Sequence, residues 1–438
     1  MKRKITRRSF LKTAGTVAIA VSAAGILTAC GDDTGAPPSN GSGGNSGTPE
    51  VPKEDGNKGE DFKDDGDKGN KPDDGEEIIE TKWIYKKIDA ENVEIQGYNG
   101  TLESNVMIPA TIGKYKVRKV GGLKERDEIQ SVTIPVGVQS IDSYAFHDCR
   151  SLKQVTLPEG LQSISYNAFA GCTLLSTINF PNSITEIGMW AFYNCAKLTA
   201  ISITSKLNVI ETHAFYGTGI DTLVIPKHVR EVGWDAFAGC EKLKTVRIEG
   251  TPKFEDGVFS YCENLISVEL LDDIERIGDG MFQGCSSLQN FNFPSKLKYI
   301  GEEAFAYAGL TEGNLPEGLL RIEKQAFYSS NLASIRIPRM VTDIGQSVFE
   351  WTELTKVALP DGLTEINEKL FAHCGKLQSV YIPASVQSIA TDAFEYCSIQ
   401  DVYYGGTKDQ LERFETGDAF SKATIHENAN ALTFAMNI

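Results

Sequence analysis

The sequence is poor in positive charge and in the short motifs of catalytic sites. It has 43 lysines and arginines against 59 aspartates and glutamates, which gives a formal net charge of −16. Nucleic-acid binding needs a basic surface that displaces counterions, so this acidic chain is not expected to bind DNA or RNA. It contains no nucleophile elbow, no H-E-x-x-H sequence and no phosphate-binding glycine loop. The five histidines are scattered along the chain. We therefore expect neither an enzyme nor a bound cofactor or metal.

An apolar stretch close to the N-terminus is too short to span a membrane. It covers Gly15–Ala29, about fifteen residues, whereas a spanning helix needs roughly 20. All the charges of residues 1–30 are positive and precede this stretch. Residues 1–30 therefore predict an export signal.

Two shorter patterns refine this prediction. The sequence Leu27-Thr28-Ala29-Cys30 resembles a lipobox, which implies that Cys30 is acylated with diacylglycerol and becomes the N-terminus of a membrane-anchored lipoprotein. An ordinary cleavage site with an incidental cysteine is the alternative. Residues 6–12, TRRSFLK, resemble the twin-arginine export motif. A general secretory signal that happens to contain two arginines is the alternative to that route.

Residues 31–80 have too few apolar side chains to offset the entropy cost of folding. They carry fifteen acidic residues against five lysines, a charge of −10. This composition predicts a disordered acidic tether. A flexible chain of about fifty residues spans roughly 40 Å, and more when its charges repel one another.

The rest of the chain is a repeat. A small apolar residue followed by phenylalanine returns every 22 or 23 residues, and the twelve phenylalanines are Phe146, Phe169, Phe192, Phe215, Phe237, Phe259, Phe282, Phe305, Phe327, Phe349, Phe371 and Phe394. A fixed period of this size predicts a solenoid, in which each coil buries its apolar face only against its neighbours.

The segment from Leu152 to Phe169 illustrates one coil. Leu152, Val155 and Leu157 follow the spacing L-x-x-V-x-L, which predicts a strand with one inward face. Pro158 then ends the strand and starts a turn. A second apolar pair points inward again before Ala168-Phe169, where the change of period predicts a short helical or tight turn.

This spacing resembles the start of the leucine-rich-repeat signature, but it continues with Pro and then I-x-x-x-A-F-x-x-C. The combination resembles the BspA-like leucine-rich-repeat surface proteins of bacteria, over about residues 92 to 428. The resemblance includes an entry sequence, VEIxGYxG at 93–100, and an exit sequence, YYxGT at 403–407. It implies a mainly β solenoid of 22 to 23 residues per coil. We expect an N-terminal cap and irregular first repeat at 81–128, regular coils at 129–399 and a C-terminal cap at 400–438.

The cysteines occupy one position of the repeat. All except Cys30 lie three residues after the repeat phenylalanine, at Cys149, Cys172, Cys195, Cys240, Cys262, Cys285, Cys374 and Cys397. Other coils hold Thr218, Ala308, Ser330 and Thr352 there, so the position selects a small side chain. We predict buried free thiols, with disulfides or a metal ladder as the alternative.

The outward positions of the first strand of each coil are the predicted ligand-binding face. Most of them are small and polar, but five carry the charged and aromatic groups that dominate interface energies, Arg247, Glu269, Arg336, Tyr381 and Tyr403. An ordinary solvated sheet face is the alternative. Trp190, Trp234 and Trp351 lie beside the Ala-Phe element, either as the edge of the core or as binding anchors.

These features favour a lipid-anchored cell-surface protein that binds through its solenoid. The resemblance implies an adhesin-like role, in which the partner is a host matrix protein, another cell or a glycan. A structural or spacer element of the cell envelope with no single ligand is the alternative. An enzyme is the least supported class, since no residue pattern supplies a nucleophile, a base or a metal.

Overall fold

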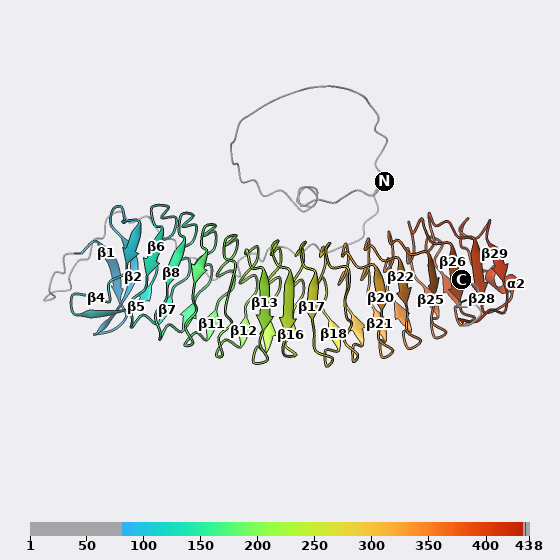
Figure 1. Ribbon diagram of the computed structural model, residues 1–438, viewed down its shortest axis with the longest axis horizontal. Coiled ribbons are helices and arrows are strands. Elements are labelled where there is room, and N and C mark those ends of the chain that lie inside the picture. The colour runs from blue at the N-terminus through green and yellow to red at the C-terminus, as the bar shows by residue number, and fades with distance from the viewer. Residues whose placement is uncertain (1–80, 432–433, 435–438) are drawn as a thin grey trace, which may run out of the picture. The chain divides into compact units, whose positions relative to one another are not determined.

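The computed structural model describes residues 81–431 and Phe434. The predicted export signal, Cys30 and the tether lie outside these residues. The described part of the chain is a row of about 15 stacked coils with almost no helix (Figure 1). The predicted solenoid architecture is therefore confirmed.

Most regular coils contribute a first strand, before the proline turn, to one side of the stack. We call this side the first strand face, and its strands pair in parallel with equivalent residues opposite, as Val155 opposite Ile178. Its members are β3 (Asn105–Met107), β6 (Ser131–Thr133), β8 (Gln154–Thr156), β10 (Thr177–Ile178), β13 (Thr222–Ile225), β15 (Thr245–Ile248), β17 (Ser267–Glu269), β20 (Glu312–Asn314), β22 (Ser334–Arg336), β24 (Lys356–Ala358), β26 (Ser379–Ile382), β28 (Asp401–Tyr404) and β29 (Thr424–His426).

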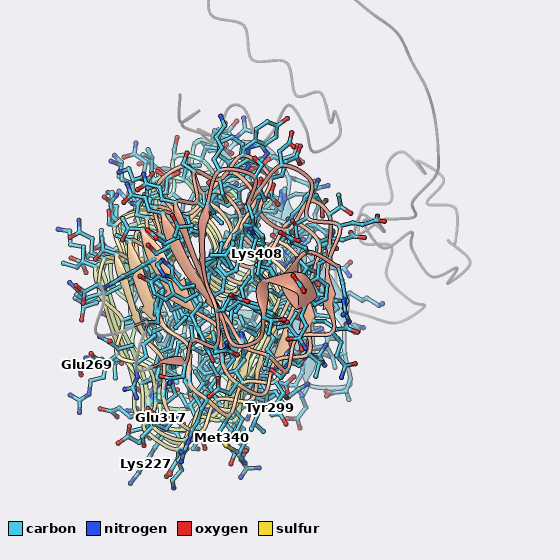
Figure 2. The ribbon with its side chains drawn as sticks, turned by 90° about the vertical axis from the view of Figure 1, so that its right-hand side faces the viewer. Lys227, Glu269, Tyr299, Glu317, Met340 and Lys408 are labelled. Atoms are coloured by element: carbon cyan, nitrogen blue, oxygen red, sulfur yellow. The ribbon has the colours of Figure 1, made fainter. Side chains whose placement is uncertain are left out.

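A second side, the second strand face, consists mostly of two-residue strands. Its members are β2 (Asn92–Tyr98), β5 (Tyr115–Val120), β7 (Ser140–Ile141), β9 (Ser163–Ile164), β11 (Glu186–Ile187), β12 (Val209–Ile210), β14 (Glu231–Val232), β16 (Lys253–Phe254), β18 (Arg276–Ile277), β19 (Tyr299–Ile300), β21 (Arg321–Ile322), β23 (Asp343–Ile344), β25 (Glu365–Ile366) and β27 (Ser388–Ile389). Figure 2 shows Glu269 of the first face and Tyr299 of the second on different sides of the coil, with Lys227, Glu317 and Met340 on the loops between them.

Three further elements lie at the ends of the stack. Strand β1 (Trp83–Lys87) pairs antiparallel with β2, and β4 (Thr111–Ile112) pairs antiparallel with β5. The short helix α2 (Lys408–Leu411) follows the last long strand of the first face.

The Ala-Phe element is a tight turn rather than a helix, and these turns form the third side, the turn edge. Two residues of nearly every turn, two before and two after the phenylalanine, have φ between about 50° and 75°. Three alternate amides of a turn donate to carbonyls of the next coil, as Phe146 N–H does to Ala168 O at 2.8 Å. The backbone polar groups of the turn are thus satisfied by the neighbouring coils, as buried amides require.

The twelve repeat phenylalanines form a continuous ladder through the core. Each is at most 1% exposed, and each ring lies on the next with centroids 5.2 to 6.0 Å apart. Because every ring except the terminal ones packs between two others, no coil completes its core alone.

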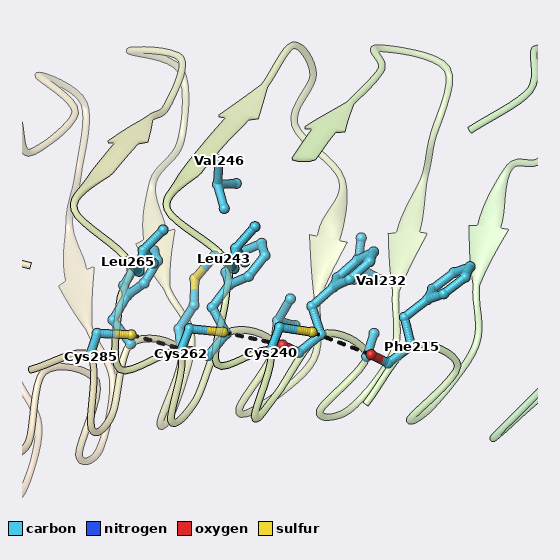
Figure 3. Packing of buried hydrophobic residues seen from close by; sticks show 14 of the residues in the cluster. Phe215, Val232, Cys240, Leu243, Val246, Cys262, Leu265 and Cys285 are labelled. Atoms are coloured by element: carbon cyan, nitrogen blue, oxygen red, sulfur yellow. Dashed lines mark hydrogen bonds between the residues drawn. The ribbon is translucent and has the colours of Figure 1, made fainter. Parts of the chain in front are cut away.

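The cysteine position lies beside this ladder. Each of the eight thiols donates a hydrogen bond to a backbone carbonyl of the preceding coil, as Cys240 Sγ does to Phe215 O at 3.3 Å (Figure 3). All eight are free, and seven are buried. Burial raises the pKa of seven of the eight thiols, to about 12 for Cys149 and about 11 for Cys374. The prediction of small, buried free thiols is therefore confirmed for seven of the eight.

Candidate functional site

The outward positions of the first strand face are exposed along most of the stack. The residues between the two inward apolar positions of each first strand segment, from Thr133 to Arg336, point to solvent, while those apolar neighbours point into the core. This alternation is the one expected from the sequence, because successive side chains of a strand lie on opposite faces. The face thus presents a row of side chains on a rigid backbone.

Arg247 and Glu269 are cross-strand neighbours on this face. They are paired in register between β15 and β17, and Arg247 Nε lies 3.8 Å from Glu269 Oε2. A second carboxylate, Glu249 Oε1, lies 3.4 Å from Arg247 Nη2. Arg247 and Glu269 are largely exposed and Glu249 is partly exposed, so the pairs contribute little to stability, and Arg247 and Glu269 remain available to a ligand.

Arg336 lies three coils further along, on β22. Its side chain is 75% exposed, and its guanidinium pairs with Glu317 on the preceding loop at 2.5 Å. It is not in contact with Arg247 or Glu269. The predicted charged residues therefore form two separate spots on one face rather than a single constellation.

The expected exposure of Tyr381 and Tyr403 is wrong. Tyr381 is 3% exposed and Tyr403 8%, because the chain after β29 folds back and places Phe434 against both rings, with centroids 6.2 and 5.3 Å away. The Tyr381 hydroxyl donates to Asp361 Oδ1 at 2.9 Å. Burial, followed by this contact with a carboxylate, raises the pKa of Tyr381 above its usual range.

Residues that the sequence interpretation did not single out complete this covered end. The imidazole of His426 stacks on Tyr403 at 4.2 Å, and its Nε2 lies 2.8 Å from Asp401 Oδ1. Ala429 N–H donates to Tyr404 O at 2.9 Å, which directs the following chain over the strands. The C-terminal end of the first strand face is therefore a closed apolar contact.

The three tryptophans on the turn edge differ in exposure. Trp190 is partly buried between Tyr166 and Tyr193, which agrees with the core-edge interpretation. Trp234 and Trp351 are 54% and 42% exposed. These two are the ones that remain candidates for binding anchors.

A row of aromatic residues at the C-terminal end of the turn edge was also not predicted from the sequence. Trp351, His373 and Tyr396 occupy the same position in consecutive coils and stack at 4.1 and 4.6 Å. All three have positive φ, which costs a non-glycine residue roughly 1 to 2 kcal/mol. Glycine fills this position at Gly171, Gly217, Gly239 and Gly284. The sequence signal that could have revealed this row is the presence of aromatic residues, in three consecutive coils, at a position that glycine fills in other coils.

Two other kinds of site were sought among residues 81–431 and Phe434. No group of three or more histidines, cysteines, aspartates or glutamates there is placed to hold a metal ion. None of the helices in these residues has the length and apolarity to cross a membrane.

The sequence itself decides the family. The pattern described as the BspA type leucine rich repeat region (6 copies) matches residues 123–244, 211–330 and 300–425, more than half of the chain. The chain belongs to the BspA-type leucine-rich repeat family. The solenoid of this family is typically a binding scaffold rather than an enzyme. A comparison with curated proteins gave no match.

Several solved structures are similar to this chain. A leucine-rich repeat protein from Bacteroides ovatus is 23% identical, with a TM-score of 0.54, over 80% of this chain and 100% of that one. The pneumococcal vaccine antigen PcpA is 21% identical, with a TM-score of 0.59, over 80% of this chain and 98% of that one. A leucine rich cell surface protein from Faecalibacterium prausnitzii is 23% identical, with a TM-score of 0.47, over 79% and 99%.

Proposed function

We propose that this BspA-type protein is exported, anchored to the membrane through a lipid on Cys30, and binds a protein or glycan on host tissue or neighbouring cells. The binding surface is the exposed part of the first strand face, around Arg247, Glu269 and Arg336. It is a non-enzymatic adhesin-like role.

The observation that supports this role is the difference in contacts between the inward and the outward residues of each coil. The inward residues are committed to the phenylalanine ladder and the strand core, whereas the outward residues of the first strand face make few contacts with the rest of the chain. A rigid row of exposed side chains can bind a ligand without a large ordering cost. Arginine in particular is enriched among residues that dominate binding.

A binding screen with the exported chain tests this role. The probes are immobilised matrix proteins, whole bacterial cells and a glycan array. For a ligand found in this way, Arg247→Ala with Glu269→Ala should weaken binding about tenfold, which corresponds to about 1.4 kcal/mol. Lys298→Ala with Glu275→Ala is the matched control, because this exposed ion pair, 2.9 Å apart, lies beside the second strand face.

Two results would count against the proposal. If the Arg247 and Glu269 double variant and a further Arg336→Ala variant bind the ligand as tightly as the parent, the first strand face is not the site. If the whole panel gives no binding, the structural or spacer role in the envelope is favoured instead.

Anchoring is tested separately. Cys30→Ala should release the protein into the medium or leave an unprocessed precursor, since the thiol is the group that takes the lipid. Membrane fractions and the mass of the processed chain measure both outcomes. Normal processing and unchanged membrane attachment of this variant would contradict the lipoprotein assignment.

A further inference from the structure

A shallow depression of about 220 Å³ lies where the second strand face meets the turn edge, over β12 and β14. It is lined by the carboxylates of Glu211, Glu231 and Glu255 and by the indole of Trp234. Gly233 also lines it, at a point where an added Cβ would lie 2.6 Å from the backbone nitrogen of Thr212. Only glycine allows the coils to approach this closely, so no side chain from this position fills the depression.

The Trp234 ring is held in place although it is more than half exposed. Its Nε1–H donates to Glu255 Oε2 at 2.9 Å. Because this bond already fixes the ring, a ligand that packs against it does not have to order it. The face of an indole attracts cations more strongly than the face of tyrosine or phenylalanine.

The carboxylates around the ring are incompletely neutralised. Lys253 pairs with Glu255 and lies 4.0 Å from Glu231. No side chain in residues 81–431 donates a hydrogen bond to the Glu211 carboxylate or forms an ion pair with it. Burial raises the pKa of Glu211, and the nearby charges of Glu186 and Glu231 raise it further. The depression therefore keeps an excess of negative charge.

We propose that this depression binds a lysine or arginine side chain from a basic segment of a partner protein. The cation lies over the Trp234 ring and against the carboxylates of Glu211 and Glu231. This surface is separate from the first strand face. The proposal rests on the proposed function in one respect only, that the ligand is a protein.

Charge favours a cationic side chain over a neutral sugar. A sugar can stack on an indole, but its hydroxyl groups do not offset the repulsion between Glu186, Glu211 and Glu231. A cation offsets this repulsion and also interacts with the ring. The chain as a whole is acidic, with a net charge of −16, and so attracts basic partners over a longer range.

Calorimetric titration of the exported chain with a short peptide of four lysines separated by glycines tests the proposal. Trp234→Ala and Glu211→Gln should each weaken binding about three- to tenfold, the range expected for a cation–π contact or one charge contact. Trp234→Phe, which keeps a ring, should weaken it less. Acetylation of the lysines should remove the binding that depends on Trp234.

Two matched variants separate this site from general attraction to an acidic protein. Glu302→Gln makes the same charge change at a distant point of the turn edge, and Tyr144→Ala removes an exposed aromatic ring elsewhere on that edge. Both should bind the peptide within about twofold of the parent, a difference of less than about 0.5 kcal/mol. Thermal unfolding confirms that each variant is folded.

Equal affinity of all variants for the peptide would overturn the proposal, since binding would then be non-specific. Binding of a neutral oligosaccharide that needs Trp234, without binding of the peptide, would also overturn it. The ligand found for the first strand face is tested on the same variants. Because Trp234 does not contact that face, a negative result for one surface does not change the result for the other.

Discussion

Replacement of Phe237 by alanine should divide the solenoid into two units that unfold separately. Phe237 is fully buried near the middle of the ladder, with ring centroids 5.5 Å from Phe215 and 6.0 Å from Phe259. Its removal takes away both stacking contacts and leaves a cavity between two coils. Phe→Ala changes in protein cores cost about 3 to 5 kcal/mol.

The effect on cooperativity follows from the one-dimensional arrangement of the coils. In a solenoid, coils are coupled only through the interfaces with their neighbours. A loss of about 3 to 5 kcal/mol at one central interface is a large fraction of the coupling that makes both halves unfold together. We therefore expect urea unfolding of Phe237→Ala to show two transitions where the parent shows fewer.

Hydrogen exchange measured by mass spectrometry is the assay, because it reports protection for each coil. In Phe237→Ala, peptides on one side of the lesion should lose protection at a lower urea concentration than those on the other side. Phe146→Ala is the control, since Phe146 stacks on only one repeat phenylalanine, Phe169, and its loss should fray one end. If Phe237→Ala unfolds with the parent's profile and midpoint, the ladder does not carry the coupling between coils.

Three further outcomes follow from burial. Cys172→Ala and Cys262→Ala should each lower the free energy of urea unfolding by no more than about 1 to 2 kcal/mol, because each removes one small buried group. A greater loss would show that the hydrogen bond of the thiol matters more than its size. Burial shields these thiols and raises the pKa of most of them, so they should resist alkylation at pH 8 in the folded chain. All eight should react once the chain is unfolded without reductant, and recovery of disulfides would contradict this. Tyr381→Ala should cost about 2 to 4 kcal/mol, since its ring and its bond to Asp361 are buried, whereas Arg336→Ala should stay within about 0.5 kcal/mol, as exposed changes do.

The regular coils could be predicted from the sequence because the same constraint recurs twelve times. The inward residues, the proline turns and the small residue three positions after each phenylalanine are each fixed by packing against an equivalent neighbour. The left-handed turns were harder to predict from the sequence. Asparagine, serine and tryptophan occupy in some coils the position that glycine occupies in others, and this obscures the pattern. The period therefore gives the coil, but not every backbone conformation within it.

The covered end of the first strand face could not be predicted in the same way. Tyr381 and Tyr403 occupy outward positions by the repeat pattern, and the side chain that buries them, Phe434, belongs to a segment outside the repeat. A single contact of this kind has no period to reveal it. The cap contains a second aromatic ring contact, between Phe420 and Phe394 at 5.2 Å. It is made by the Ala419-Phe420 pair, which is displaced from the regular interval of the repeat.

Departures from the repeat are also where binding is expected. At the left-handed positions, glycine satisfies the coil at the least cost, so Trp351, His373 and Tyr396 destabilise the turns without improving the core. Trp234 likewise leaves more than half of its surface in water, and Glu211 keeps a half-buried carboxylate without a partner in the described chain. Folding alone does not explain side chains that cost stability and remain exposed. We therefore expect binding at these positions, because a ligand that packs on them would supply the contacts that the coil leaves unmade.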